Sequence, residues 1–334
     1  MSSRGKGSAV QLCAWEWFGR RTHHHSSFDP AELLRLKGDT TVSVVLPALD
    51  EERTVGSIVS TLHRALVEQI PLIDELVVID PGSTDRTAEV ARAAGAVVVA
   101  EADVLPSLGR IPGKGEAMWK SLHATTGDIV CWIDADIEDV HPSFVYGLVG
   151  PLLTDPSTQF VKAFYERPLG DAAALLPTGG GRVTELVARP LINLHWPELA
   201  GFIQPLSGEY AGRRAVLEAV PFVSGYGVEL GLLIDLLETV GLDGLAQVDL
   251  ERRVHRHQDH QALGRMAFVL QQTALSRLER SGRVTMTSRA STTLMQFDSA
   301  QAGYRVDPYD LPLAERPPMT SVRAAERSAT RTGA

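Results

Sequence analysis

Four short apolar runs alternate with helical stretches, and this alternation constrains the fold more than any other feature of the chain. The strand-like runs cover residues 42–46, 76–79, 96–99 and 129–133, and the helical stretches cover residues 54–68, 84–94 and 113–125. The runs are continuously apolar, so they predict parallel strands that are buried on both faces. The sequence therefore predicts an α/β fold that begins with a Rossmann-like half, a mainly parallel sheet flanked by helices.

Composition excludes several classes of protein. The 334 residues are 44% hydrophobic and 22% charged, which is enough for one large domain or two closely packed ones. A net charge of −9 argues against a nucleic-acid-binding surface, and no apolar run is as long as a membrane span. The two cysteines, Cys13 and Cys131, build neither a disulfide framework nor a zinc site. We therefore expect a cytoplasmic protein with a small-molecule substrate, and no nucleic acid or membrane as partner.

Carboxylates follow three of the predicted strands. Asp134 and Asp136 follow the last strand at positions i and i+2, so both side chains lie on one face of an extended backbone and can reach one hard cation. Residues 47–52 (Pro-Ala-Leu-Asp-Glu-Glu) follow the first strand, and residues 80–85 (Asp-Pro-Gly-Ser-Thr-Asp) follow the second. Each segment alone is equally consistent with simple helix capping. Together, at the edge where open α/β sheets bind ligands, they indicate a nucleotide site with a metal.

Lys114 lies between two glycines at the start of a predicted helix. Backbone amides at a helix N-terminus carry partial positive charge, so this lysine is suited to contact a phosphate or a base carbonyl. The segment is not a Walker A loop, because the glycine spacing and the Ser or Thr after the lysine are missing.

The second half of the chain contains three glycines followed by an arginine. Residues 178–185 (Thr-Gly-Gly-Gly-Arg-Val-Thr-Glu) open a predicted helix, and the loop amides with Arg182 are suited to bind a phosphate or carboxylate. A flexible turn with a surface arginine is the alternative. Glu209 and Glu229 each follow glycines, and we interpret Glu229 as a sugar-binding residue. Glu229 has the alternative of merely complementing a helix N-terminus.

Two groups of histidines occur in the chain. His255 and His257 precede the last long predicted helix, and a neutral imidazole of His255 is suited to complete a metal site with Asp136. Three adjacent histidines, 23–25, lie near the N-terminus. Adjacent side chains point apart, so we expect residues 1–28 to be a mobile arm and not a metal site.

Six motifs together resemble one enzyme family. They are Val-Val-Leu-Pro-Ala-Leu-Asp-Glu-Glu at 44–52, Asp-Pro-Gly-Ser-Thr-Asp at 80–85, Pro-Gly-Lys-Gly-Glu-Ala at 112–117, Gly-Gly-Gly-Arg-Val-Thr-Glu-Leu-Val-Ala-Arg-Pro-Leu at 179–191, Gln-Pro-Leu-Ser-Gly-Glu-Tyr-Ala at 204–211 and Gly-Tyr-Gly-Val-Glu at 225–229. The chain resembles the actinobacterial glucosyl-3-phosphoglycerate and mannosyl-3-phosphoglycerate synthases, which are retaining glycosyltransferases of the GT-A fold. The resemblance implies transfer of a hexose from a nucleotide sugar to the 2-hydroxyl of 3-phosphoglycerate, with a divalent metal, Mg or Mn.

The resemblance also implies roles for individual residues. Nucleotide-sugar contacts fall on Pro47, Leu49, Glu51, Pro81, Gly82, Lys114, Asp134, Ala135, Leu206, Tyr226 and Glu229. Acceptor contacts fall on Gly181, Arg182, Thr184 and His257, and metal contacts fall on Asp136 and His255. The catalytic residues would be Glu229, Asp136 and Arg182. Retention requires either Glu229 as a nucleophile or attack on the front face of the sugar.

Two positions depart from the family pattern. Pro81 stands where the glucosyl enzymes usually have serine, which removes a hydroxyl and a backbone N–H beside the base, and His257 stands where the family commonly has asparagine. We therefore expect GDP-mannose as the favoured donor, with relaxed use that includes GDP-glucose or UDP-glucose.

The patterns divide the chain into four segments and predict a homodimer. An N-terminal arm with a short helix covers 1–40, a nucleotide-sugar-binding half 41–140, an acceptor-binding half 141–284, and an extended C-terminal tail 285–334. The tail is expected to pack on a neighbour or to stay mobile.

Two alternative functions fit parts of the sequence. A sugar nucleotidyltransferase would carry a glycine-rich loop with an arginine after the first strand, but residues 47–52 contain no glycine. A non-catalytic 3-phosphoglycerate-binding protein would not need the paired carboxylates of Asp134 and Asp136.

Overall fold

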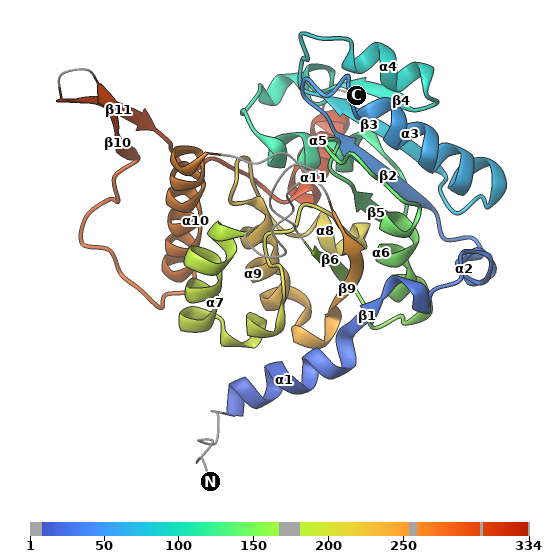
Figure 1. Ribbon diagram of the computed structural model, residues 1–334, viewed down its shortest axis with the longest axis horizontal. Helices are drawn as coiled ribbons and strands as arrows, with labels where there is room; N and C mark the ends of the chain where they lie inside the picture. The colour runs from blue at the N-terminus through green and yellow to red at the C-terminus, as the bar shows by residue number, and fades with distance from the viewer. Residues whose placement is uncertain (1–8, 167–180, 254–258, 301–302, 333–334) are drawn as a thin grey trace.

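The computed structural model describes residues 9–166, 181–253, 259–300 and 303–332, and within these ranges the chain forms a mixed α/β fold around an eight-stranded sheet (Figure 1). The strands of this sheet are β1 (Thr22–His24), β2 (Val42–Pro47), β3 (Glu75–Asp80), β4 (Val97–Ala100), β5 (Ile129–Trp132), β6 (Phe160–Glu166), β7 (Tyr210–Arg213) and β9 (Leu245–Arg252). Their spatial order is β1-β9-β6-β7-β5-β2-β3-β4. No helix in the described ranges is long and apolar enough to cross a membrane.

The sheet is parallel except at one strand. β4, β3, β2 and β5 pair in parallel, as the alternation of strands and helices predicts, and β6, β9 and β1 form a second parallel group. β7 lies between the two groups and runs antiparallel to both β5 and β6. Tyr210 at the start of β7 pairs with Trp132 at the end of β5. The segment that precedes β7 therefore reaches the same edge of the sheet as the segments that follow the parallel strands.

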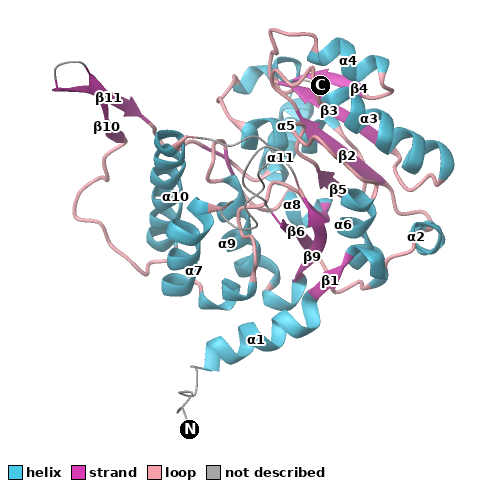
Figure 2. Cartoon of the chain, in the orientation of Figure 1, coloured by secondary structure: helices cyan, strands magenta, loops and turns pink. Residues whose placement is uncertain are grey.

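Helices cover both faces of the sheet (Figure 2). One face carries α2 (Pro30–Lys37), α3 (Val55–His63), α4 (Thr87–Ala93) and α6 (Ser143–Thr154), and the other carries α5 (Lys114–Ala124) and α9 (Val228–Val240). Alternate residues of one strand enter different layers: Val44 packs with α3 and α6, whereas Val45 packs with α5. Two-sided burial explains why β2, β3 and β5 are apolar throughout. The prediction of burial on both faces is wrong for β4, which lies at the edge of the sheet and has no buried residue.

The N-terminal region differs from the mobile arm that we expected. Helix α1 (Ala9–Arg21) leads into β1, which pairs in parallel with β9. Trp17 is fully buried, and its indole Nε1 donates a hydrogen bond to the carbonyl oxygen of Leu245 at 2.9 Å. The prediction is therefore wrong for residues 9–28, because Trp17 ties α1 to the centre of the fold.

The C-terminal region also differs from the extended tail that we expected. After α10 (His260–Arg280) the chain forms a hairpin of β10 (Thr293–Ala300) and β11 (Gly303–Asp310), which projects at the upper left of Figure 1. It then returns to its own core, where β12 (Glu315–Arg316) pairs with β8 (Phe222–Val223). The last described helix, α11 (Met319–Thr332), lies beside α5, and Met319 is fully buried.

Arg316 joins this returning segment to the helix that carries Lys114. Its guanidinium makes two 2.7 Å contacts with the buried carboxylate of Glu116, and it also donates to the carbonyl oxygens of Leu108 and Gly109 at 3.0 Å. The C-terminal segment thereby holds both the start of α5 and the loop before it.

We expect Arg316→Ala to lower the free energy of unfolding by about 3–5 kcal/mol, because the buried carboxylate of Glu116 would lose both contacts with the guanidinium. Urea unfolding measures this loss. Arg305→Ala is the control, because Arg305 pairs with Asp298 and Asp307 on the hairpin with 68% of its side chain exposed, and exposed pairs contribute about 1 kcal/mol or less. Equal losses in the two variants would contradict the role given to Arg316.

Candidate active site

A cavity of about 720 Å³ lies at the edge where β2, β3 and β5 end. The predicted site residues on its wall are Pro47, Leu49, Glu51, Pro81, Lys114, Asp134, Ala135, Asp136, Gly181, Arg182, Thr184, Leu206, Tyr226 and Glu229. The cavity thus brings together residues that the sequence assigned to donor, metal and acceptor. His255 and His257 lie outside the described residues.

Gly82 does not line the cavity. Its φ is +102°, and its N–H donates to the Asp80 carboxylate at 3.0 Å, so it forms the turn after β3. The two acidic strand ends also bind each other, since the Thr84 amide donates to Asp50 at 2.7 Å and the Asp50 amide donates to Ser83 at 3.0 Å. Capping and loop formation therefore account for part of these motifs.

Asp134 accepts contacts from two cations. Lys114 donates to one of its carboxylate oxygens, and Arg253 Nη2 lies 2.9 Å from the other. The same Nη2 atom lies 2.7 Å from Asp136 Oδ1, and Lys114 Nζ lies 3.5 Å from Glu229 Oε1. These contacts join the end of β5 to the start of α5, the start of α9 and the residue after β9.

Arg253 is a site residue that the sequence analysis missed. Its side chain is 4% exposed, and Nη1 lies 3.0 Å from Glu209 Oε1 and donates to the Tyr165 hydroxyl at 2.8 Å. Glu209, the carboxylate that the sequence places after Gly208, is fully buried and is not on the cavity wall. Its carboxylate instead holds the Arg253 guanidinium against Asp134 and Asp136.

The charges around Asp134 favour a bound cation. Burial alone would raise the pKa of Asp134, but Lys114 and Arg253 hold it well below its usual range. Burial likewise opposes the charge of Lys114, yet Asp134, Glu229 and Glu209 raise its pKa. Four carboxylates, those of Asp134, Asp136, Glu209 and Glu229, surround these two cations in the described cluster. Carboxylate oxygens suit a hard divalent metal such as Mg²⁺ or Mn²⁺, so the residues present fit the predicted metal.

Three glycines allow these charged groups to approach each other. A Cβ atom on Gly115 would lie 1.9 Å from the Val223 carbonyl oxygen, and one on Gly113, whose φ is +129°, would lie 2.2 Å from the Ser224 carbonyl oxygen. These contacts place the start of α5 directly against the segment before α9. A Cβ on Gly208 would lie 2.1 Å from the Asp134 carboxylate and 2.7 Å from Lys114 Nζ.

Lys162 supports the loop that contains Gly208. Its Nζ donates to the Ser207 carbonyl oxygen at 2.8 Å and lies 4.2 Å from the centre of the Tyr210 ring. Burial lowers the pKa of Lys162 to about 7. No pattern along the chain pointed to Lys162, because one lysine in an apolar strand is an ordinary feature.

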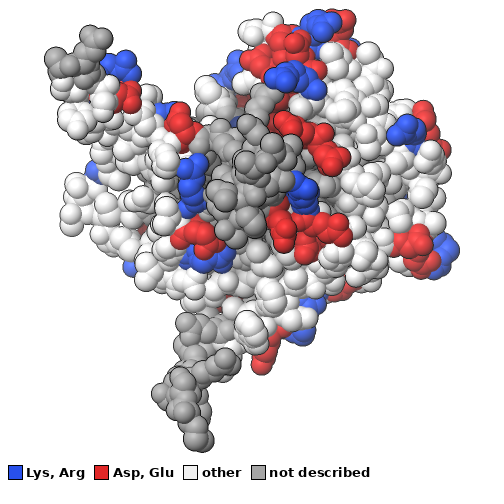
Figure 3. Space-filling model, viewed as in Figure 1, with Lys and Arg blue, Asp and Glu red and all other residues white. Residues whose placement is uncertain are grey.

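Three of the predicted acceptor residues, Gly181, Arg182 and Thr184, also line the cavity. Gly181 has a φ of +80° and precedes Arg182, which begins the helical stretch that contains the π-helical turn η5 (Thr184–Ala188). Arg182 Nη1 lies 3.0 Å from His260 Nε2 at the start of α10. Acidic and basic side chains lie close together near the middle of the face shown in Figure 3.

Known proteins share this sequence and architecture. A model of glycosyl transferase family 2 matches residues 43–205. Glucosyl-3-phosphoglycerate synthase from Petrotoga mobilis is 47% identical over 306 residues, which cover 91% of this chain and 94% of that protein. Mannosyl-3-phosphoglycerate synthase from Rubrobacter xylanophilus has a similar structure, with a TM-score of 0.85 and 42% identity over 92% of this chain and 98% of that one. Glucosyl-3-phosphoglycerate synthase from Mycobacterium tuberculosis, solved with Mn²⁺, UDP-glucose and phosphoglyceric acid, has a TM-score of 0.79 and 44% identity over 90% and 98% of the two chains.

The fold and the cavity define a glycosyltransferase of the GT-A type. Similarity over nine-tenths of the chain shows more: the chain belongs to the family of glucosyl-3-phosphoglycerate and mannosyl-3-phosphoglycerate synthases, which are hexosyltransferases. The predicted fold class and family are therefore confirmed, and the nucleotidyltransferase and the non-catalytic binding protein are disfavoured. The roles given to individual residues stay predictions.

Proposed function

We propose that the chain transfers a hexose from a nucleotide sugar to the 2-hydroxyl of 3-phosphoglycerate, with retention of the anomeric configuration and with a divalent metal. The observation that carries the proposal is that one cavity joins the carboxylates of Asp134 and Asp136 to the Gly181-Arg182 segment. The first group suits a nucleotide and its metal, and the second suits an anionic acceptor. The solved Mycobacterium tuberculosis relative contains Mn²⁺, UDP-glucose and phosphoglyceric acid together.

The donor side provides positive charge for the leaving nucleoside diphosphate. Asp136, with His255 by the family resemblance, would hold the metal, which supplies charge to stabilise the diphosphate when bound. Lys114 lines the same cavity and is fixed by Asp134 and Glu229. Because its pKa is raised, Lys114 carries its charge at neutral pH.

Glu229 and Tyr226 are the residues proposed to contact the transferred sugar. Both line the cavity: Tyr226 lies just before α9, and Glu229 lies in its first turn. As the leaving group departs, the anomeric carbon takes on oxocarbenium character, which a nearby carboxylate stabilises. Glu229 acts either as the nucleophile of a double displacement or as the stabilising charge during front-face attack.

The acceptor side recognises the charged groups of 3-phosphoglycerate. The Arg182 guanidinium can donate two parallel hydrogen bonds to a phosphate or a carboxylate. Gly181 and Thr184 line the cavity beside it. The acceptor hydroxyl would then be held toward Glu229 by contacts remote from the reacting atoms.

Nucleoside diphosphate release from a sugar nucleotide in the presence of 3-phosphoglycerate tests this function. We expect Asp136→Ala to reduce the rate roughly 10²-fold or more, because the diphosphate charge loses its metal. Asp139→Ala is the matched control, since Asp139 is exposed and lies off the cavity wall. Absence of release with any hexose donor would refute the function, and full activity in a chelator would refute the metal.

We propose GDP-mannose as the preferred donor, with GDP-glucose and UDP-glucose also used. Pro81 supports this choice because it lies on the cavity wall directly after β3, and proline offers neither a hydroxyl nor a backbone N–H to select a base. Selection would then rest on the sugar rather than on the base.

Pro81→Ser should shift relative donor use toward UDP sugars and leave the KM for 3-phosphoglycerate unchanged, because only the base-side wall changes. Initial rates with GDP-mannose and UDP-glucose at saturating acceptor give the ratio. Pro106→Ser is the control, since Pro106 is exposed and not on the cavity wall. An unchanged ratio in Pro81→Ser would show that the base is recognised elsewhere.

Arg182→Lys and Arg182→Ala should raise the KM for 3-phosphoglycerate roughly 10-fold to 150-fold, the equivalent of about 1.5–3 kcal/mol for a bidentate charged contact. Lysine cannot reproduce the planar fork. Calorimetry should find nucleotide-sugar affinity nearly intact in both variants. Arg289→Lys, at an exposed position off the cavity wall, is the control. Loss of nucleotide affinity with normal acceptor affinity would assign Arg182 to the donor diphosphate.

We also propose that the chain forms a homodimer through the β10–β11 hairpin. The hairpin register places Phe297 opposite Val306, and Met295 and Tyr304 share their face. All four are exposed. The other face is held to α10, where Gln296 contacts Gln261 and Arg265. A second copy of the chain would cover the exposed apolar face, which is costly to leave in water.

Phe297→Asp should convert a dimer to a monomer in sedimentation or light scattering, because a charge on this face opposes burial. Leu194→Asp, at another exposed apolar residue on α7 (Arg189–His195), should leave the oligomeric state unchanged. A dimer that persists in Phe297→Asp would place the interface elsewhere.

A further inference from the structure

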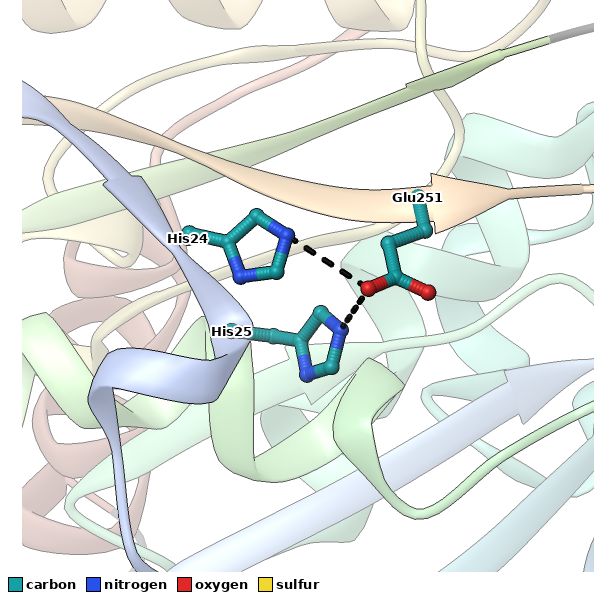
Figure 4. A group of neighbouring side chains, drawn as sticks. All are labelled: His24, His25 and Glu251. Atoms are coloured by element: carbon teal, nitrogen blue, oxygen red, sulfur yellow. Dashed lines mark ion pairs between the residues drawn. The ribbon is translucent and has the colours of Figure 1, made fainter.

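Two histidines and a glutamate converge at the edge of the sheet, away from the wall of the active-site cavity. Figure 4 shows His24 at the end of β1, His25 at the start of the 3-10 turn η1 (His25–Ser27), and Glu251 on β9. Glu251 Oε1 lies 3.2 Å from His25 Nε2 and 3.5 Å from His24 Nε2. The three potential ligand atoms all lie within 4.8 Å of one another.

A change of backbone conformation brings the adjacent histidines together. His24 is extended, with φ −112° and ψ 140°, and the chain turns into η1 at His25. The two rings consequently stack, with centroids 4.6 Å apart and 30° between their planes. Our expectation that adjacent side chains point apart holds for a continuous strand and fails at its end. His23 lies elsewhere, with its ring 5.7 Å from that of Phe28.

A β-bulge directs the glutamate toward these rings. Phe164 pairs with Asp249 and Glu166 pairs with Arg252, so β9 contains one residue more than β6 across this step. Glu251 lies in the bulge with a φ of +66°, which is uncommon for a residue with a side chain. Bulges redirect side chains out of the regular alternation of a strand.

We propose that His24, His25 and Glu251 bind a zinc ion. Tetrahedral zinc with bonds of about 2.0–2.2 Å separates its ligand atoms by roughly 3.3–3.5 Å, and the two nitrogen-to-oxygen distances agree with this. Two imidazoles and one carboxylate form a donor set that zinc takes, whereas the oxygen ligands of the active site suit Mg²⁺ or Mn²⁺. The side chain of Glu251 is 65% exposed, so water completes the coordination.

Neighbouring oxygens are placed to orient both rings. Ser26 Oγ lies 2.7 Å from His24 Nδ1, and the Tyr146 hydroxyl lies 3.5 Å from His25 Nδ1. A histidine that binds metal through Nε2 donates its Nδ1–H to such an acceptor. His24 Nδ1 also accepts a hydrogen bond from the Ser26 amide at 3.2 Å. In the absence of metal, this hydrogen bond favours the ring proton on Nε2, where it can contact Glu251. Zinc bound at Nε2 would require that proton to be carried by Nδ1 instead, with Ser26 Oγ as its acceptor.

The site would connect the sheet edge to the active site. Glu251 precedes Arg253 by two residues, and the Arg253 amide donates to the Glu166 carbonyl oxygen at 3.1 Å just beyond the bulge. A metal bound by His24, His25 and Glu251 would hold the end of β1 and the bulge of β9 in fixed positions. Arg253 would then be held where its side chain contacts Asp134 and Asp136.

Cobalt is the probe, because Co²⁺ takes zinc sites and absorbs visible light. The full-length protein, first treated with chelator and then held in excess Mg²⁺, is titrated with Co²⁺. We expect one equivalent to produce a visible absorption band that Zn²⁺ abolishes. Glu251→Gln and His25→Gln should each weaken Co²⁺ binding at least about tenfold, as expected when a ligand is lost. His23→Gln, the matched control at the adjacent histidine, should bind as the unmodified chain does.

Asp136→Asn separates this site from the active site, because it removes an active-site carboxylate and should leave the cobalt band intact. Circular dichroism checks folding, and Glu251→Gln changes an exposed side chain without changing its shape. A band that disappears in Asp136→Asn and survives in Glu251→Gln would assign the metal to the active site and overturn the proposal. Absence of any saturable band would show that the cluster is only an ion pair and would also overturn it.

Discussion

The contacts of Lys114 and Arg253 with Asp134 are the interaction on which the active site depends. Asp134, Asp136 and Glu209 all contact the Arg253 guanidinium, so three carboxylates gather around one buried cation. The two cations make that arrangement stable before any ligand binds. Since Lys114 and Arg253 come from α5 and from the residue after β9, the same contacts fix the distance between elements far apart in the sequence.

Local patterns predicted most of this edge of the sheet. Continuous apolar runs identified β2 to β5, and the residues that follow them were correctly expected to gather at one place. The Gly-Lys-Gly segment was correctly expected to open a helix at Lys114. The close approach of its glycines to Val223 and Ser224 was not predicted. In each case, the signal lies within a few residues of the feature that it predicts.

Long-range contacts could not be predicted in this way. Arg253 follows a strand, β9, whose partners β1 and β6 lie in other regions of the chain, and nothing beside it signals its contact with Asp134. Trp17 and Arg316 similarly attach the two ends of the chain to Leu245 and Glu116. Composition alone described both ends as polar and irregular, because one buried aromatic or one buried arginine hardly changes an average.

The antiparallel strand explains why residues from both halves of the chain line one cavity. In an all-parallel sheet, only segments that follow strands reach the ligand-binding edge. β7 runs in the opposite direction, so the segment before it reaches that edge, and Leu206 and Gly208 lie on the cavity wall. Gly208 also contacts the Asp134–Lys114 pair through its main chain, since the Lys114 amine donates to its carbonyl oxygen at 3.3 Å. The reversal of one strand therefore joins the two parallel groups into a single site, and it requires glycine at 208 because a Cβ would displace the carboxylate that the site is built around.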